Sequence, residues 1–225
     1  MSGHRNPSVS KAGPSEDLVR VLREEGIRDP RVLEAFRRVR REQFVPLAHV
    51  LNAYEDRPIP IAQGQVTTQP SLVARMVEAL RLTGGERVLE VGTGLGFQTA
   101  ILAALARVVY SIERFPDLAA QARRNLEVAR VVGPTVLVGD GTTGLPEHAP
   151  FDAIVVAAAA PQVPAPLVAQ LAEGGRLVHP VGPGGNEVVT AFRKEGGTLI
   201  EEARLVRAYF VPLVGRYALA GDEAG

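Results

Sequence analysis

The stretch VLEVGTGLGFQTAILAAL, residues 88–105, decides the fold of this chain. It begins with an apolar run that predicts a strand, passes through a glycine-rich bend and ends with the apolar spacing of a helix. A strand, a glycine loop and a helix in this order are typical of a doubly wound α/β sheet that binds a nucleotide. Glycines let the backbone turn sharply and approach a ligand closely, and the following helix begins with free N–H groups.

The spacing of the glycines bears on which ligand this loop would hold. Gly92, Gly94 and Gly96 form G-x-G-x-G, whereas the dinucleotide fingerprint would need a glycine at the position of Phe97. Glu90 precedes the loop, and a carboxylate there would repel a pyrophosphate and favour a ligand with an ammonium group. The loop alone leaves a structural turn, a dinucleotide and S-adenosylmethionine open, and the electrostatics favour S-adenosylmethionine.

Two more acidic residues follow the next two predicted strands. Glu113 ends the strand 108–113 about 20 residues beyond the glycines, where related sheets bind a ribose diol. Asp140 ends the strand 135–140 and is a candidate acceptor for an adenine amino group. Each acid alone has an ordinary explanation, such as a helix cap at Asp140 or a surface charge. Because parallel strands end at one edge of the sheet, the three acids together point to one crevice.

Strands and helices alternate after Gly85, which predicts a mostly parallel sheet with helices on both faces. We expect further strands at 87–91, 151–158 and 174–182, and helices at 97–106, 115–129 and 164–172. The segment 186–215 has period-two stretches around Gly196 and Gly197, which predicts antiparallel strands at the edge of the sheet. The predicted fold class is a doubly wound Rossmann-like α/β sheet with an N-terminal helical extension.

The N-terminal third has a different pattern. Residues 15–50 predict helices whose arginines form a solvated face, or alternatively a contact surface for an acidic partner. Residues 54–70 are irregular, but Ile59 and Ile61 predict an ordered loop packed on the body, followed by a helix over 71–82. We therefore expect a flexible tail over 1–15, N-terminal helices and an active-site loop over 16–84, and a cofactor-binding domain over 85–225, packed as one unit.

The composition excludes several classes of function. The 225 residues contain no cysteine, which rules out disulfides, thiolate catalysis and cysteine-ligated metals, and we expect no metal. The 25 basic and 25 acidic side chains give a net charge of zero, so we expect no nucleic-acid partner. The longest apolar stretch, 153–161, is shorter than the roughly 20 residues that span a bilayer, and the N-terminus lacks an apolar signal core. We expect a cytoplasmic monomer.

Several segments, in order, closely resemble the protein-L-isoaspartate O-methyltransferases. They are VLEAFRRVRREQFVP (32–46), AYEDRPIPIAQGQVTTQPSLVARM (53–76), VLEVGTGLGFQTAILA (88–103), VYSIERFPDLA (109–119), the long run 138–182 and FVPLVG (210–215). The resemblance implies methylation of the α-carboxylate of L-isoaspartyl residues in damaged proteins and peptides. S-adenosylmethionine would be the donor and S-adenosylhomocysteine the product. The ester would reclose to a succinimide, which opens partly to normal aspartate.

The resemblance also implies a set of site residues. Thr68 matches the family's active-site serine, and its role would be positional, because a carboxylate acceptor is already ionised and needs no base. The implied cofactor-binding residues are Val66, Thr67, Glu90, Gly92, Thr93, Gly94, Gly96, Glu113, Arg114, Asp140 and Gly141. The implied substrate-binding residues are Thr68, Gln69, Val211, Pro212 and Leu213, which we expect to form walls around an extended peptide or simply to close the core.

Three positions depart from the family pattern. Val66 stands where a threonine is usual, Ala157 follows the fourth strand where threonine is frequent, and Arg40 replaces a proline.

Rival functions are a methyltransferase for RNA or a small molecule and a non-catalytic nucleotide-binding module. A dehydrogenase is less favoured because of Glu90 and Phe97.

Overall fold

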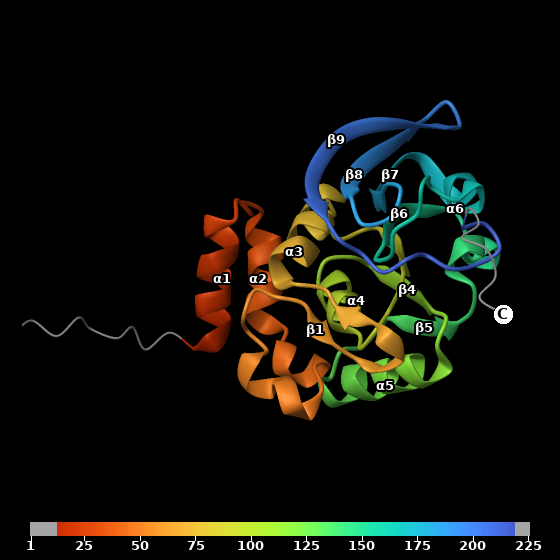
Figure 1. The fold of residues 1–225 in the computed structure, drawn as a ribbon. Helices are drawn as coiled ribbons and strands as arrows, with labels where there is room; N and C mark the ends of the chain where they lie inside the picture. The colour runs from red at the N-terminus through yellow and green to blue at the C-terminus, as the bar shows by residue number, and fades with distance from the viewer. Residues whose placement is uncertain (1–12, 219–225) are drawn as a thin grey trace, which may run out of the picture.

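The computed structural model describes residues 13–218, so the predicted tail over 1–15 lies outside it except for its last three residues (Figure 1). Helix α1 already begins at Pro14. A seven-stranded sheet in the order β5-β4-β3-β6-β7-β8-β9 forms the centre of the molecule. Its strands are β3 (Arg87–Val91), β4 (Val108–Glu113), β5 (Thr135–Val138), β6 (Phe151–Val156), β7 (Leu171–Val181), β8 (Glu187–Glu195) and β9 (Thr198–Ala208).

The pairing of the strands confirms the predicted fold class. The pairs β5–β4, β4–β3, β3–β6 and β6–β7 are parallel, whereas β7–β8 and β8–β9 are antiparallel. The chain starts in the middle of the sheet at β3, moves outward to β4 and β5, and then returns to the other side of β3 with β6. The carboxyl ends of β3 and β6 therefore form a topological switch point, where open α/β sheets bind their ligands.

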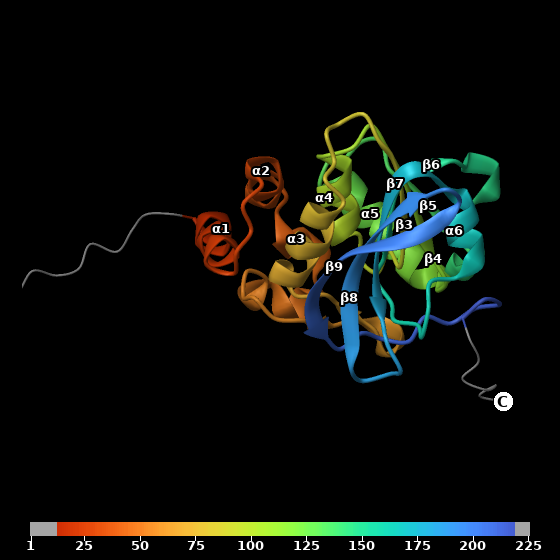
Figure 2. The ribbon, with the colours of Figure 1, turned by 90° about the horizontal axis from the view of Figure 1, so that it is seen from above.

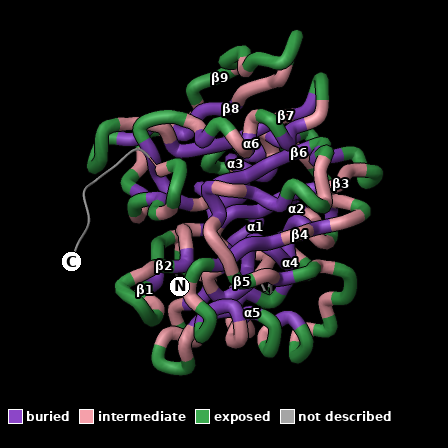
Figure 3. The backbone as a smooth tube through the Cα atoms, turned by 90° about the vertical axis from the view of Figure 1, so that its right-hand side faces the viewer, coloured by how far each residue is buried: buried purple, intermediate pink, exposed green. Residues whose placement is uncertain are grey.

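Successive side chains of the central strands point to opposite faces, and each face has its own core. Val88 packs in a cluster with residues of α3 (Pro70–Ala79), α4 (Phe97–Ala103) and α5 (Pro116–Val128). Leu89 packs in the other cluster with α6 (Ala165–Gln170). The 3-10 turns η4 (Gly141–Thr143) and η5 (Pro146–His148) follow β5. Figure 3 shows the central strands as mostly buried and the β8–β9 turn as exposed.

The N-terminal helices share the core of the sheet. α1 (Pro14–Glu24) and α2 (Pro30–Arg38) lie beside α3 in both ribbon views (Figures 1 and 2). Leu22 and Phe36 are completely buried in the same cluster as Val88. The ring of Phe36 meets Phe97, the first residue of α4, edge to face with centroids 5.6 Å apart. The helical extension is thus packed onto the body by hydrophobic contact.

The helical pattern predicted over 15–50 ends earlier than expected. Val39 takes an extended conformation after α2, and only the short 3-10 helices η1 (Arg41–Phe44) and η2 (Leu47–Asn52) follow. Pro46 separates them, because proline has no N–H to continue a helix. The helix predicted over 71–82 is α3, which begins at Pro70 and ends at Ala79.

The irregular stretch after η2 is ordered, as predicted. Ile59 is 1% exposed, and Ile61 is half-buried. β1 (Ile59–Pro60) pairs antiparallel with β2 (Val66–Thr67), and the 3-10 turn η3 (Ala62–Gly64) joins them. The small hairpin brings the residues that precede α3 over the carboxyl edge of the central sheet.

The C-terminal edge confirms the antiparallel hairpin but corrects its length. Gly196 and Gly197 have φ angles of 56° and 80°, which fit a two-residue hairpin turn that other residues adopt poorly. β9 ends at Ala208 instead of continuing to Gly215. The segment 209–215 leaves the edge and crosses to the end of β6, where Val211 and Leu213 form backbone hydrogen bonds with Ala159.

Candidate active site

The glycine loop after β3 requires its three glycines for backbone reasons. Gly92, Gly94 and Gly96 have φ angles of 96°, 55° and 93°, all in the left-handed region. Gly92 donates its N–H to the carbonyl of Ile112, and Ala157 donates to the carbonyl of Val91, both at 2.8 Å. A Cβ added at Gly92 would lie 3.3 Å from the Cβ of Ala157. The loop therefore sits tightly at the switch point between β3 and β6.

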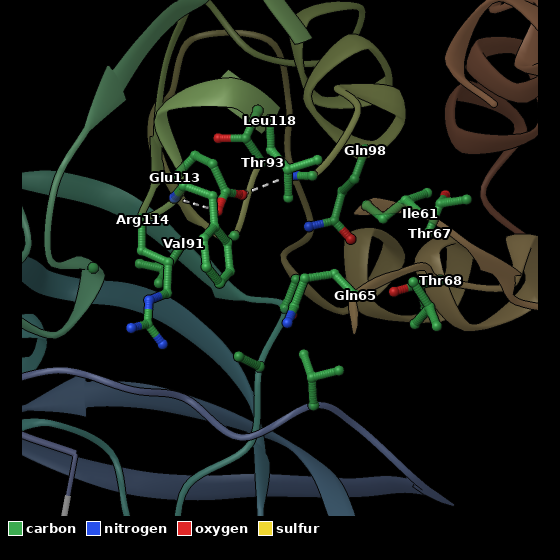
Figure 4. Close-up of a pocket in the computed structure, with 18 of the residues that line it drawn as sticks. Ile61, Gln65, Thr67, Thr68, Val91, Thr93, Gln98, Glu113, Arg114 and Leu118 are labelled. Carbon is green, nitrogen blue, oxygen red and sulfur yellow. Dashed lines mark hydrogen bonds between the residues drawn. The ribbon is translucent and has the colours of Figure 1, made fainter. Parts of the chain in front are cut away.

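A cavity opens above this loop, at the carboxyl ends of the central strands (Figure 4). We call it the donor cavity. The predicted cofactor-binding residues that line it are Val66, Thr67, Gly92, Thr93, Gly94, Glu113, Arg114 and Gly141. The structure thus brings together eight of the eleven residues from four separate segments of the chain. Gly96, Glu90 and Asp140 do not line the cavity.

Glu113 is held in the wall of the donor cavity by the backbone. Its carboxylate accepts hydrogen bonds from the N–H of Gly94 at 2.8 Å and of Phe115 at 3.1 Å. Each oxygen takes one of these bonds, so each keeps acceptor capacity for a ligand hydroxyl. Figure 4 shows Glu113 and Arg114 on one side of the cavity and Thr67 and Thr68 on the other. This position suits the predicted contact with a diol.

Glu90 lies behind the glycine loop and not in the cavity. Its side chain points to the same face as Val88 and accepts hydrogen bonds from the hydroxyls of Thr99 and Ser111, at 2.5 and 2.6 Å. Complete burial raises the pKa of Glu90 to about 7, although the two hydroxyls act in the opposite direction. The side-chain alternation of β3 places the carboxyl under α4. Both hydroxyls bond Oε2, and the buried Oε1 has no hydrogen-bond partner among the described residues. Contact with a ligand ammonium group stays a prediction.

Asp140 is also engaged within the protein. It caps η4 by accepting from the N–H and hydroxyl of Thr142, and it accepts from the N–H of Arg216 at 2.7 Å. Partial burial acts to raise the pKa of this carboxyl, but the hydrogen bonds from Arg216 and Thr142 outweigh it and lower the pKa. Asp140 thus ties the end of the chain to the sheet, and its neighbour Gly141 lines the cavity. Contact with an adenine stays a prediction.

A groove adjoins the donor cavity. We call it the acceptor groove, and it runs between the 58–72 segment and the residues that follow β9. Four residues line both the cavity and the groove: Val66, Thr68, Ala157 and Val211. The two spaces therefore meet at Thr68, the predicted catalytic residue. Gln69 lines the groove but not the cavity, as the predicted substrate contact would require.

The predicted substrate residues of the C-terminal segment serve partly to close the core. Val211 accepts a hydrogen bond from the N–H of Ala159, and Leu213 donates to the carbonyl of Ala159. These backbone groups are therefore used within the protein, and Pro212 has no N–H to offer. All three residues also line the donor cavity, so they contribute surface to the site.

Sequence reasoning missed several residues of the cavity. Gln98, the second residue of α4, lines it, and its buried Nε2 makes no hydrogen bond of good geometry among the described residues, although the side chain is close enough to Glu90 to act to lower the pKa of that carboxyl. A buried amide without a partner is costly, so Gln98 is a candidate to bind a polar group of a ligand. Phe115 and Leu118 line the cavity from the beginning of α5, directly after Glu113. The sequence signal that could have identified Phe115 and Leu118 is their position just after Glu113, the acid that ends β4.

Arg41 was also missed, because the arginines of 15–50 were predicted to lie on a solvated face. That prediction is wrong for Arg41, which is completely buried. Backbone carbonyls accept hydrogen bonds from its two terminal nitrogens, and a sequence pattern does not reveal such a set of acceptors. The neighbouring Arg38 and Arg40 are exposed and pair with Glu34 and Glu42, as a solvated face would.

The donor cavity contains few titratable groups, and those that line the acceptor groove are Glu25, Arg75, Arg207 and Tyr209. Among the described residues, Glu113 and Arg114 are the only titratable ones that line the donor cavity, and no histidine lines the cavity or the groove. His179 is completely buried in β7, and burial lowers its pKa to about 4. Residues 13–218 contain no group of three or more His, Cys, Asp or Glu side chains placed to hold a metal. No helix in that range is long and apolar enough to cross a membrane.

Comparison with known proteins identifies relatives over almost the whole chain. The sequence model of the protein-L-isoaspartate(D-aspartate) O-methyltransferase family matches residues 13–218. A protein-L-isoaspartate O-methyltransferase of Methanoculleus marisnigri is 50% identical over 202 residues, which cover 89% of this chain and 91% of the relative. A protein-L-isoaspartate O-methyltransferase 2 of Marinobacter nauticus is 54% identical over 191 residues, covering 84% and 87%.

Solved structures give the same result. One protein-L-isoaspartate O-methyltransferase superposes with a TM-score of 0.80 at 29% identity, covering 91% of this chain and 67% of that one. A putative protein-L-isoaspartate O-methyltransferase from Plasmodium falciparum, solved with S-adenosyl-L-homocysteine, superposes with a TM-score of 0.78 at 25% identity. That match covers 90% of this chain and 99% of the other.

Proposed function

The chain belongs to the protein-L-isoaspartate(D-aspartate) O-methyltransferase family, and we propose that it uses the donor cavity and acceptor groove to methylate isoaspartyl residues. The methyl donor is S-adenosylmethionine, and the acceptor is the α-carboxylate that an isoaspartyl linkage leaves free in a damaged protein or peptide. The observation that carries the assignment of residues is the meeting of the cavity and the groove at Thr68.

The residues of the donor cavity fit S-adenosylmethionine. Glu113 presents a fixed carboxylate for the ribose hydroxyls, and the left-handed backbone of the glycine loop leaves room for a close approach. The amide of Gln98, whose Nε2 makes no hydrogen bond of good geometry among the described residues, offers a buried donor for the carboxylate of the methionine part. The apolar residues Phe115 and Leu118 suit the adenine. When bound, this group supplies a methyl on a positively charged sulfur, which a carboxylate oxygen can accept directly.

The residues at the junction account for the reaction that the site would support. An isoaspartyl carboxylate is ionised at neutral pH, so its oxygen is a nucleophile without proton removal. The lack of a histidine along both spaces supports such an acceptor. The Thr68 hydroxyl would donate a hydrogen bond to the carboxylate and orient it, while the hairpin and the C-terminal segment would exclude water. Orientation of this kind is a main source of rate enhancement.

A pair of peptides tests the proposal. The protein is incubated with methyl-labelled S-adenosylmethionine and two peptides that differ only in an isoaspartyl or a normal aspartyl linkage. Base-labile label on the isoaspartyl peptide alone is the expected result, because a methyl ester hydrolyses in mild base. Label on neither peptide, or equal label on both, would contradict the proposed substrate.

The remaining features of the proposal concern organisation. We propose a cytoplasmic monomer that acts on peptides and proteins without a nucleic-acid or membrane partner, with the regions 16–84 and 85–225 working as one unit. The net charge of zero and the common hydrophobic cluster of α1, α2 and the sheet support this view. Size-exclusion chromatography with light scattering would test the monomer.

A further inference from the structure

One buried cation lies beneath the loop that carries Thr68. The guanidinium of Arg41 donates to the carbonyl of Ala53 at 2.7 Å and of Glu55 at 3.1 Å from Nη1. From Nη2 it donates to the carbonyl of Arg57 at 3.3 Å and of Thr68 at 3.2 Å. These acceptors lie 12, 14, 16 and 27 residues further along the chain. We call residues 53–68 the active-site loop, and Arg41 holds it from inside at four points.

The burial of Arg41 has a clear physical cost and a clear compensation. A charged side chain at 0% exposure loses its hydration, and no carboxylate lies within ion-pair distance of it among the described residues. Burial lowers the pKa of Arg41 to about 10, with Asp56 acting weakly in the other direction, so the guanidinium stays charged at neutral pH. Four carbonyl dipoles replace the lost water at the two terminal nitrogens, whereas the buried Nε has no hydrogen-bond partner among the described residues. A planar guanidinium can serve four separate carbonyls at once, whereas a lysine ammonium has three donors at a single nitrogen.

Arg41 also contacts the donor side of the site. Its guanidinium carbon lies 5.4 Å from the ring centroid of Phe97, within the range of a cation–π contact. Phe97 begins α4 directly after the glycine loop and lines the donor cavity. One side chain therefore touches the carbonyl of Thr68 on the acceptor side and the ring of Phe97 on the donor side.

From this geometry we propose that Arg41 is a positioning residue for the methyl transfer, which sets the place of Thr68 relative to the donor cavity. The role rests on the proposed function of the site. Arg41 lines neither the cavity nor the groove, so it acts through the backbone of the active-site loop. Removing it should release Thr68 and the β1–β2 hairpin while leaving Glu113 and the glycine loop in place.

The test compares Arg41→Ala, Arg41→Lys and the matched control Arg38→Ala, whose arginine is exposed and pairs with Glu34. For Arg41→Ala we expect kcat/KM for an isoaspartyl peptide to fall by about 10²-fold, as misplacement of a reacting group by about 1 Å can produce. The affinity for S-adenosylhomocysteine, measured by calorimetry, should change by less than about threefold. The kcat/KM of Arg41→Lys should lie between those of Arg41→Ala and the wild-type protein. The kcat/KM of Arg38→Ala should match that of the wild-type protein.

Guanidinium rescue separates positioning from simple loss of structure. Guanidinium chloride at a few tens of millimolar should restore part of the kcat/KM of Arg41→Ala, because the free ion can enter the carbonyl cage. Guanidinium chloride should not restore the kcat/KM of Thr68→Ala, because that variant lacks the hydroxyl itself. Hydrogen exchange provides a readout without activity: amides of residues 53–68 should exchange faster in Arg41→Ala and slow again with guanidinium.

The outcomes are decisive in each direction. A folded Arg41→Ala with wild-type kcat/KM would overturn the proposal, as would a parallel loss of donor affinity and activity without rescue. If Arg41→Ala does not fold, the same measurements are made on Arg41→Lys. Wild-type kcat/KM in Arg41→Lys, together with unchanged hydrogen exchange in the active-site loop, would then overturn the proposal. Inactivity of the wild-type protein toward isoaspartyl peptides would instead count against the proposed function.

Discussion

Replacement of Glu90 by glutamine provides a quantitative test of how this site is built. The wild-type carboxyl is completely buried under α4, and its pKa is raised from 4.5 to about 7. Glu90→Gln keeps the size of the side chain and removes its titration. The hydroxyls of Thr99 and Ser111, which now donate to Glu90, can donate to the amide oxygen instead.

The sign of the effect follows from the protons bound in each state. Between pH about 4.5 and about 7 the native protein retains a proton on Glu90 that the unfolded chain has lost, so the free energy of unfolding falls as pH rises. One pKa unit corresponds to about 1.4 kcal/mol, so the wild-type protein should lose about 3 kcal/mol relative to Glu90→Gln across this window. For a chain of this size, that difference corresponds to roughly 6–12 °C in Tm.

Urea unfolding of both proteins at several pH values between about 5 and about 8 measures this difference directly. The comparison uses the pH slope of the difference, so any constant change caused by the amide cancels. Parallel curves for the two proteins would refute a buried carboxyl with a raised pKa. Calorimetry on the same variant should show an affinity for S-adenosylhomocysteine within about threefold of the wild type. A loss of affinity beyond about tenfold would indicate that Glu90 contacts the ligand directly.

Three other substitutions test the assigned contacts. Glu113→Gln should weaken S-adenosylhomocysteine binding by about tenfold or more, because hydrogen bonds to a charged acceptor are worth about 1.5–3 kcal/mol, and unchanged calorimetry would refute the ribose contact. Thr68→Ala should lower kcat by about tenfold with donor affinity intact, and Thr68→Ser should retain most activity. Wild-type turnover in Thr68→Ala would eliminate its role. Val66→Thr adds a hydroxyl at the junction and should lower KM for the peptide by about fivefold if the usual threonine contact is missing here.

Local patterns in the sequence predicted most of the fold. The alternating strands and helices after Gly85, the hairpin at Gly196 and Gly197, and the ordered stretch around Ile59 are all present in the structure. These features depend on residues close together in the chain, where periodicity, glycine conformation and turn geometry act directly. The same patterns misjudged where elements end, as at Ala208, because the end depended on a distant partner at Ala159.

The sequence by itself determined the glycine loop, the acid at the end of β4 and, through resemblance, the family and the role expected of Thr68. Only the tertiary structure decided which acids line the donor cavity. Glu90 is the penultimate residue of β3 and Glu113 the last residue of β4, but the alternation of β3 turns Glu90 under α4, while the amides of Gly94 and Phe115 hold Glu113 in the cavity wall. The burial and the hydrogen-bond partners of a side chain depend on segments that come into contact only when the chain has folded. Local sequence patterns do not predict these long-range contacts.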